Sequence, residues 1–186
     1  MDLTDLERQA SACELCELYK GQNQSVFAKG SEASNIVVCG MCPGPEENKV
    51  GIPFVGDAGK ILDKIFLEAF GNDSSSLDVY VTNLVKCFVS PGTQLQQKWM
   101  ITCLPYFIVQ VKLINPRIIV ALGRDVSNFL LNNTLPMKDM RGKLFDYMGI
   151  KLLSTYHPSY LVRSGGTKHK HFQTVVNDFK QIYKYM

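Results

Sequence analysis

The chain has 186 residues, 46% of them hydrophobic, and a formal net charge of +3 at pH 7. That length is enough for a substantial core, so we expect residues 1–186 to form a single domain. No apolar run approaches the roughly 18 residues of a membrane span, and the first five residues lack a signal-peptide pattern. We therefore expect a cytoplasmic protein that is neither secreted nor bound to a membrane.

The first seventy residues predict two helices on either side of one buried strand. Residues 3–18 form the first expected helix, residues 19–34 an irregular arm over the surface, and residues 35–40 a strand. Gly40 opens twenty residues rich in Gly and Pro, which stiffen a loop and shape its backbone. The clearest helix covers residues 57–70, because its apolar side chains recur at i, i+3 and i+4.

The rest of the chain alternates strands with helices. A polar turn at residues 72–76 comes first, and the further expected elements are strands 78–83, 117–122 and 152–155 and helices 95–114, 124–131 and 172–185. Pro105 is expected to kink the long helix or to start a new segment, because proline lacks the amide that a helix interior needs. Strands joined by helices form parallel sheets covered on both faces. We therefore predict a three-layer α/β/α fold with a central four-stranded parallel sheet.

Two segments, residues 138–151 and 163–171, are locally basic. A polyanion bound near these loops would explain the excess of Lys and Arg, but so would two solvated surface loops. The charge pattern alone leaves both interpretations open.

The six cysteines do not suggest a disulfide framework in a protein expected inside the cell. Cys13 and Cys16 form a C-x-x-C pair on the first expected helix, and Cys87 and Cys103 lie far downstream. Four thiolates divided in this way can close one metal or iron–sulfur site. The alternative, that the two downstream cysteines are small buried hydrophobic residues, stays open on spacing alone. In a third interpretation the remaining two cysteines form a redox or metal pair.

Distinctive side chains follow three of the expected strands. Residues 40–44 and Phe54 follow the first strand, the second ends at Asn83, and the fourth ends before His157. Parallel strands end at one edge of a sheet, so a flat ring, a carboxamide and an imidazole would converge there. Asn offers a donor and an acceptor to a nucleobase edge, His can donate to an oxygen that gains charge, and Phe can stack. Taken alone, each also has a structural explanation as a turn, strand-end or core residue.

Four segments match known motifs in order along the chain. They are GMCPGPEENKVGIPFVGDAG at residues 40–59, VYVTNLVKC at 79–87, NPRIIVALG at 115–123 and STYHPSYLVR at 154–163. The first is similar to G-E-x-P-G-x-x-E-D-x-x-G-x-P-F-V-G-x-A-G, and the four together resemble the uracil-DNA glycosylase superfamily, closest to its family-four iron–sulfur enzymes. The resemblance covers nearly the whole chain and implies the fold of that superfamily.

The resemblance implies a monofunctional DNA glycosylase of base-excision repair. Such an enzyme flips uracil out of DNA and hydrolyses its N-glycosidic bond. Phe54 would stack on the extruded ring, Asn83 would contact its O4 and N3 edge, and His157 would stabilise charge at O2. The catalytic residues would then be His157 and Asn83, and the implied uracil site comprises Gly40, Met41, Cys42, Phe54, Asn83 and His157.

The resemblance also implies DNA contacts and a cofactor. The implied DNA-binding residues are Ser159, Arg163, Gly165 and Lys168. A 4Fe-4S cluster would be bound by Cys13, Cys16, Cys87 and Cys103, with residues 3–18 as the cluster-binding helix. The expected substrate is uracil-containing DNA, and the expected protein is a monomer of prokaryotic or viral type. Any replication or repair protein that binds it is not identified by the sequence.

Three positions depart from the family pattern. The family has Glu where this chain has Met41, and other branches of the superfamily have Asp or Asn where it has Cys42. Where the family pattern has an acid at the end of the first half of the motif, this chain has Asn48. The departures imply weakened or altered water activation, with Glu46 and Glu47 as candidates to position the water. The alternative is a protein that binds uracil, a modified base or DNA on the same fold without cleaving it.

Overall fold

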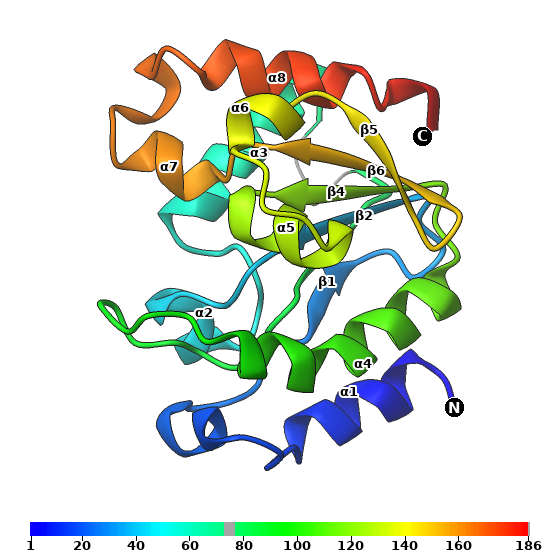
Figure 1. The fold of residues 1–186 in the computed structure, drawn as a ribbon, viewed down its shortest axis with the longest axis vertical. Helices are drawn as coiled ribbons and strands as arrows, with labels where there is room; N and C mark the ends of the chain where they lie inside the picture. Colours follow the sequence, from blue (N-terminus) through cyan, green and yellow to red (C-terminus); the bar gives the residue numbers. More distant parts are fainter. Residues whose placement is uncertain (73–76, 186) are drawn as a thin grey trace.

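The structure, a computed structural model, describes residues 1–72 and 77–185 and is built around one six-stranded sheet (Figure 1). The strands lie in the order β1-β3-β2-β4-β6-β5. The four inner strands are parallel to one another and are β3 (Tyr80–Asn83), β2 (Ile36–Gly40), β4 (Ile118–Leu122) and β6 (Ile150–Thr155). They confirm the predicted four-stranded parallel sheet. Most of the turn expected at residues 72–76 lies outside the described residues.

Helices cover both faces of the sheet, as predicted for three layers. One face carries α3 (Asp57–Phe70), α7 (Pro158–Val162) and α8 (Phe172–Lys180). The other carries α1 (Leu3–Ser11), α4 (Gln97–Ile114) and α5 (Arg124–Leu131), and Figure 1 shows α1 lying alongside α4. The shorter helical segments are α2 (Pro45–Val50), α6 (Met137–Met140) and the 3-10 turns Glu17–Gly21, Gly166–Lys168 and Tyr183–Tyr185. None of the helices in the described ranges is long and apolar enough to cross a membrane.

Each face of the sheet has its own hydrophobic core. Along β2, Ile36 and Val38 belong to the core under α3 and α8, whereas Val37 and Cys39 belong to the core under α1 and α4. Every residue of β2 and β4 is buried. Strands covered on both faces need apolar side chains at every position, and this explains the continuous apolar runs in the sequence.

The two edge strands were missed because neither has a recognisable pattern. β1 (Ala28–Gly30) has three residues within the expected irregular arm and pairs antiparallel with β3. β5 (Leu144–Tyr147) pairs antiparallel with β6 through a two-residue turn, Met148 and Gly149. Both turn residues have φ above zero, +56° and +82°, as type I′ hairpins require.

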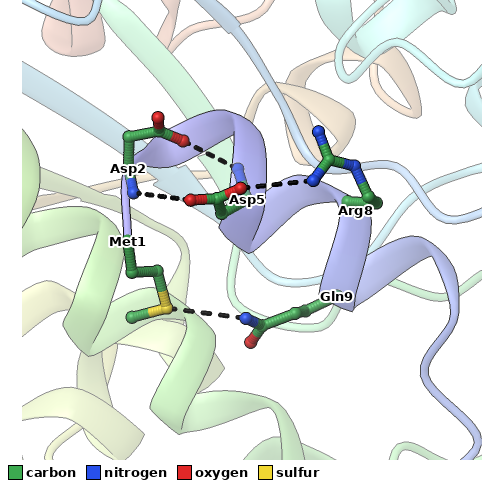
Figure 2. A network of polar contacts seen from close by, with 5 residues as sticks. All are labelled: Met1, Asp2, Asp5, Arg8 and Gln9. Atoms are coloured by element: carbon green, nitrogen blue, oxygen red, sulfur yellow. Dashed lines mark hydrogen bonds and ion pairs between the residues drawn. The ribbon is translucent and has the colours of Figure 1, made fainter.

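The first helix is shorter than predicted: it ends at Ser11, so the expected cluster-binding helix over residues 3–18 is wrong. Its start is fixed by reciprocal bonds, in which the Asp5 amide donates to Asp2 Oδ1 (2.8 Å) and the Asp2 amide to Asp5 Oδ2 (3.4 Å) (Figure 2). The buried stripe of Leu3, Leu6 and Ala10 ends there, and Leu15 is 71% exposed. A longer helix would therefore gain little burial.

Two further differences concern the other helices. α4 runs through Pro105 without interruption. Because proline has no amide hydrogen, the carbonyl of Ile101, four residues earlier, lacks its helical hydrogen-bond donor. Both residues are exposed, so water can donate to that carbonyl instead. The helix expected at 172–185 ends at Lys180, and a separate 3-10 turn follows.

Candidate functional site

A cavity of about 830 Å³ opens at the carboxyl edge of the parallel strands. The loop after β2 forms one wall, the end of β3 lies beside it, and the segment after β6 forms the opposite wall. The predicted site residues that line it are Met41, Cys42, Glu47, Phe54, Asn83, His157, Ser159 and Arg163. The topology thus brings together side chains from three strand ends, as the sequence predicted.

Phe54 is held in a strained backbone conformation at the cavity. Its φ is +54°, which is uncommon for an aromatic residue and marks many ligand sites. Lys29 Nζ donates to the Phe54 carbonyl (3.0 Å). A side chain at Gly59 would collide with the same carbonyl, and a Cβ at Gly40 would lie 2.7 Å from Phe54 Cζ. Phe54 is therefore held between the backbone of Gly59, which approaches its carbonyl, and the backbone of Gly40, which approaches its ring. Only glycine permits approaches this close.

Asn83 presents an unsatisfied acceptor. It is 2% exposed, and its Oδ1 is buried with no hydrogen-bond partner among the described residues. A side chain at Gly40 would collide with this oxygen. A buried acceptor without a partner is unfavourable by about 1–3 kcal/mol, so its retention suits a ligand donor.

His157 is held as a neutral donor. Its Nδ1 accepts from the Ser159 amide (3.1 Å) and lies 2.8 Å from Ser159 Oγ. Because Nδ1 is the acceptor, the proton of the neutral ring resides on Nε2. Burial and, to a smaller extent, the positive charge of Arg163 lower the pKa of His157 to about 4, against a raising effect of Glu47. At neutral pH the site therefore contains an uncharged imidazole with an Nε2–H donor.

Glu47 ties the two halves of the glycine-rich loop together. Its Oε1 accepts from the amides of Val55 (2.9 Å) and Gly56 (2.8 Å), and its Oε2 accepts from the Gly44 amide (3.0 Å). Glu46 lies on the exposed side of α2 and pairs with Lys49 (2.8 Å). Of the two candidate water-positioning acids, the structure places only Glu47 in the cavity wall.

Of the three positions that depart from the family pattern, Met41 and Cys42 line the cavity and Asn48 does not; the Oδ1 of Asn48 accepts from the Asn23 amide (2.8 Å). Met41 also packs against the core under α1 and α4. Burial raises the pKa of the Cys42 thiol to about 11, and the negative charge of Glu47 raises it too. At neutral pH the site therefore contains a thioether and a protonated thiol where the family and its branches have polar or acidic groups.

The basic residues after His157 are exposed. Arg163 ends α7 and lines the cavity, and Gly165 and Lys168 follow in the exposed turn. Gly165 has a φ of +109°. Of the predicted DNA-binding residues, Ser159 and Arg163 line the cavity, whereas Gly165 and Lys168 do not and follow Arg163 within five residues.

The predicted cluster cysteines lie in one neighbourhood. Cys87 and Cys103 are buried, whereas Cys13 and Cys16 are partly exposed. Burial, with smaller contributions from Cys103, Cys16 and Cys13, raises the pKa of the Cys87 thiol to about 12, so the other three thiols all act on Cys87. Among residues 1–72 and 77–185, no three side chains of His, Cys, Asp or Glu converge tightly enough to share one metal ion.

Lys86, which precedes the predicted cluster ligand Cys87, lies in the interior of the protein and not at its surface. It is 2% exposed, and burial lowers its pKa to about 8. Nζ donates to the Asn83 carbonyl (2.6 Å), Gln110 Oε1 (2.6 Å) and Thr82 Oγ1 (2.8 Å). The only sequence signal was its place between Asn83 and Cys87.

Comparison with known proteins agrees with this geometry. Residues 27–180 match the sequence profile of the Uracil DNA glycosylase superfamily. A Type-4 uracil-DNA glycosylase of Saccharolobus solfataricus is 34% identical over 168 residues, covering 86% of this chain and 77% of the relative. The corresponding enzymes of Thermotoga maritima and Archaeoglobus fulgidus are 32% and 30% identical, covering 86% and 97% of this chain and 82% and 91% of their own lengths.

A parallel sheet covered on both faces, with a cavity at the carboxyl edge of its strands, places the protein among the α/β proteins that bind ligands at this edge. Within that class, the chain belongs to the uracil-DNA glycosylase superfamily.

Proposed function

We propose that this chain removes uracil from DNA in base-excision repair by hydrolysing the N-glycosidic bond, and that Phe54, Asn83 and His157 form its uracil pocket. The activity follows from family membership, and the residue roles rest on one observation. A fixed aromatic ring, an unpartnered amide acceptor and a neutral imidazole donor meet in one cavity.

Uracil enters the cavity only after it has left the base stack. Extrusion requires a few kcal/mol and is easiest for a mispaired base or a single strand. Phe54 then stacks on the ring, and Asn83 Oδ1 accepts the N3–H of uracil while its amide donates to O4. The unsatisfied state of Oδ1 in the free protein supports this assignment.

His157 stabilises the leaving group. When the bond between C1′ and N1 breaks, its electron pair moves into the uracil ring and increases the negative charge at O2. The Nε2–H of neutral His157 donates to that oxygen, and its strength as a donor matters most in the transition state. Water adds its oxygen to C1′ and loses a proton to solvent, and the departing uracil anion takes up a proton from solvent at N1, which completes the hydrolysis.

Water activation is the weakest part of the site. Neither Met41 nor the protonated Cys42 can accept the proton of the attacking water. Glu47 lies in the cavity wall, but three backbone amides occupy its oxygens, so we assign it first to holding the loop. General-base assistance contributes about a hundred- to ten-thousand-fold, so we expect slow excision.

Ser159, Arg163, Gly165 and Lys168 are proposed to contact the DNA backbone beside the flipped nucleotide. The positions of these residues support the proposal, because Arg163 lines the cavity and the exposed turn follows it in the chain. Phosphate contacts from such residues orient DNA without reading its sequence. The protein is proposed to act as a monomer formed by residues 1–186.

The cofactor is proposed to be a 4Fe-4S cluster held by Cys13, Cys16, Cys87 and Cys103. The mutual influence of the four thiols supports this set. A cluster at this place would attach the segment after α1 to α4 and to the end of β3, which is a structural role. No chemical step at the uracil pocket depends on it.

The alternative, a protein that binds without cleaving, is not favoured, because several relatives over most of the chain are glycosylases. The test is an oligonucleotide with one uracil, incubated with enzyme in excess and then treated with alkali. We expect strand scission at uracil and none at thymine or cytosine in matched oligonucleotides. Uracil-dependent binding without scission would contradict the proposal.

A further inference from the structure

Lys86 is buried, and no carboxylate among the described residues forms an ion pair or hydrogen bond with its ammonium group. Its three Nζ hydrogen bonds all go to neutral oxygens: the Asn83 carbonyl, Thr82 Oγ1 and Gln110 Oε1. An ammonium taken out of water onto neutral acceptors is costly, and an apolar residue of similar size would avoid that penalty. Packing alone therefore does not explain why a lysine, with its charged ammonium group, occupies this buried position.

The bonds of Lys86 fix the backbone that carries Asn83. One of the two shortest, both 2.6 Å, reaches the carbonyl of Asn83 itself, and the other reaches Gln110 Oε1. Thr82 Oγ1, a second partner, donates to the Phe27 carbonyl (2.7 Å) beside β1. Gln110, the third, donates to Tyr80 OH (2.9 Å). Lys86 thus joins the end of β3 to α4 and to the chain that leads into β1.

The same residue also contacts the cysteine cluster. Its backbone faces Cys103 closely enough to oppose the rise that burial causes in the pKa of that thiol, and Cys87 is the next residue in the chain. Cys103 lies on α4 about two turns before Gln110, so the backbone and the side chain of Lys86 both face the same helix. Any shift of the cluster cysteines therefore moves the backbone to which Asn83 belongs.

We propose that Lys86 is a positioning residue: its ammonium holds Asn83 against the uracil edge, and its backbone transmits the placement of Cys87 and Cys103 to the pocket. The proposal rests on the proposed function, since it assigns Asn83 to the uracil edge. It assigns Lys86 no contact with DNA and no role in proton transfer. Its effect on catalysis passes through Asn83.

The test compares Lys86→Met with Lys112→Met, a matched control on the exposed side of α4. Single-turnover uracil release, the affinity for free uracil, iron content and the thermal midpoint are measured for both. Loss of the charge-assisted bonds predicts about a tenfold fall in rate and in uracil affinity for Lys86→Met. Lys112→Met is expected to match the wild type in all four.

A double-mutant cycle separates positioning from general destabilisation. Lys86→Met is combined with Asn83→Ala, which removes the side chain through which Lys86 is proposed to act. The rate effect of Lys86→Met should then shrink to about twofold or less, because residues that act as a unit are not additive. An equal effect with and without Asn83 would overturn the proposal.

If Lys86→Met does not fold, Gln110→Leu replaces it in both measurements. This variant removes one acceptor of the same ammonium, and a rate and uracil affinity equal to those of the wild type would overturn the proposal. Failure of the wild type and of Lys112→Met to release uracil would instead contradict the proposed function. The two failures are therefore distinguishable.

Discussion

The rings of Phe54 and His157 lie 5.9 Å apart between centroids, with their planes tilted by 30°. Phe54 belongs to the loop after β2, and His157 is the second residue after the end of β6. The two walls of the cavity therefore come from strands separated by β4 in the sheet. Their spacing depends on the sheet register and on the glycines that admit the Phe54 ring.

Phe54→Ala is expected to slow uracil release by about 10- to 100-fold, since stacking of a base on an aromatic ring contributes about 1–3 kcal/mol. The measurement is the single-turnover rate on single-stranded uracil DNA. Phe70→Ala is the control, because that ring packs against Phe66 and Phe179 near the far end of α3. Equal losses in the two variants would show that the effect is one of stability.

Gly40→Ala is expected to abolish measurable uracil binding. The added Cβ would collide with Asn83 Oδ1 and lie 2.7 Å from Phe54 Cζ, so both residues must move. Gly21→Ala serves as control, because no described atom lies within 4 Å of a Cβ there. Titration of each protein with uracil, followed by changes in intrinsic fluorescence, checks this. Wild-type affinity in Gly40→Ala would contradict the described pocket.

The pH dependence of stability should reveal His157. Its pKa is about 4 in the folded protein, below the ordinary histidine value of 6.5, so the unfolded state binds the proton first as the pH falls. Stability from this group is full above pH 6.5 and falls as the pH drops toward 4. Between pH 7 and pH 5 the loss is about 2 kcal/mol.

His157→Asn removes this titration. Urea unfolding at pH 7 and pH 5 should show a smaller loss of unfolding free energy in the variant than in the wild type, by about 2 kcal/mol. Equal losses would mean that His157 is not held neutral. The variant should also excise uracil far more slowly, because the O2 donor is gone.

Met41→Glu should raise the excision rate. The family has Glu at this position, and Met41 lines the cavity. A base placed there is expected to accelerate release by about tenfold or more, at some loss of stability because Met41 also packs against the core. Met41→Gln has nearly the same shape without the charge and should not gain. A gain in both variants would exclude a carboxylate effect.

The four-cysteine set predicts a brown protein with equal iron and sulfide. Cys87→Ser and Cys103→Ser should each lower the iron content and the thermal midpoint, since the ligand set is broken. Cys42→Ser, outside the set, should keep its iron. A colourless wild-type protein purified without oxygen, or one with zinc, would contradict the cluster.

Much of the fold could be predicted from local patterns. The helix Asp57–Phe70 was predicted with its observed bounds, because its apolar periodicity ends at Gly71, which adopts φ +83°. The buried strands stood out because both faces are covered. The edge strands could not be found, since β1 is short and β5 is half exposed.

The arrangement of the site was less predictable than its members. Phe54, Asn83 and His157 followed from strand ends, but the tautomer of His157 depends on a bond from Ser159. The part that Glu47 plays depends on how the loop folds back on itself. The burial of Lys86 needs partners 24 residues apart in sequence, a relation that no local pattern contains.

The most direct test of the uracil pocket is the release of free uracil from DNA in a single turnover, quantified as the free base. Wild-type enzyme in excess should release one uracil per substrate strand, and Phe54→Ala, Asn83→Ala and His157→Asn should each be slowed by at least tenfold while remaining folded. Release at the wild-type rate by all three variants, or no release by the wild type, would contradict the account.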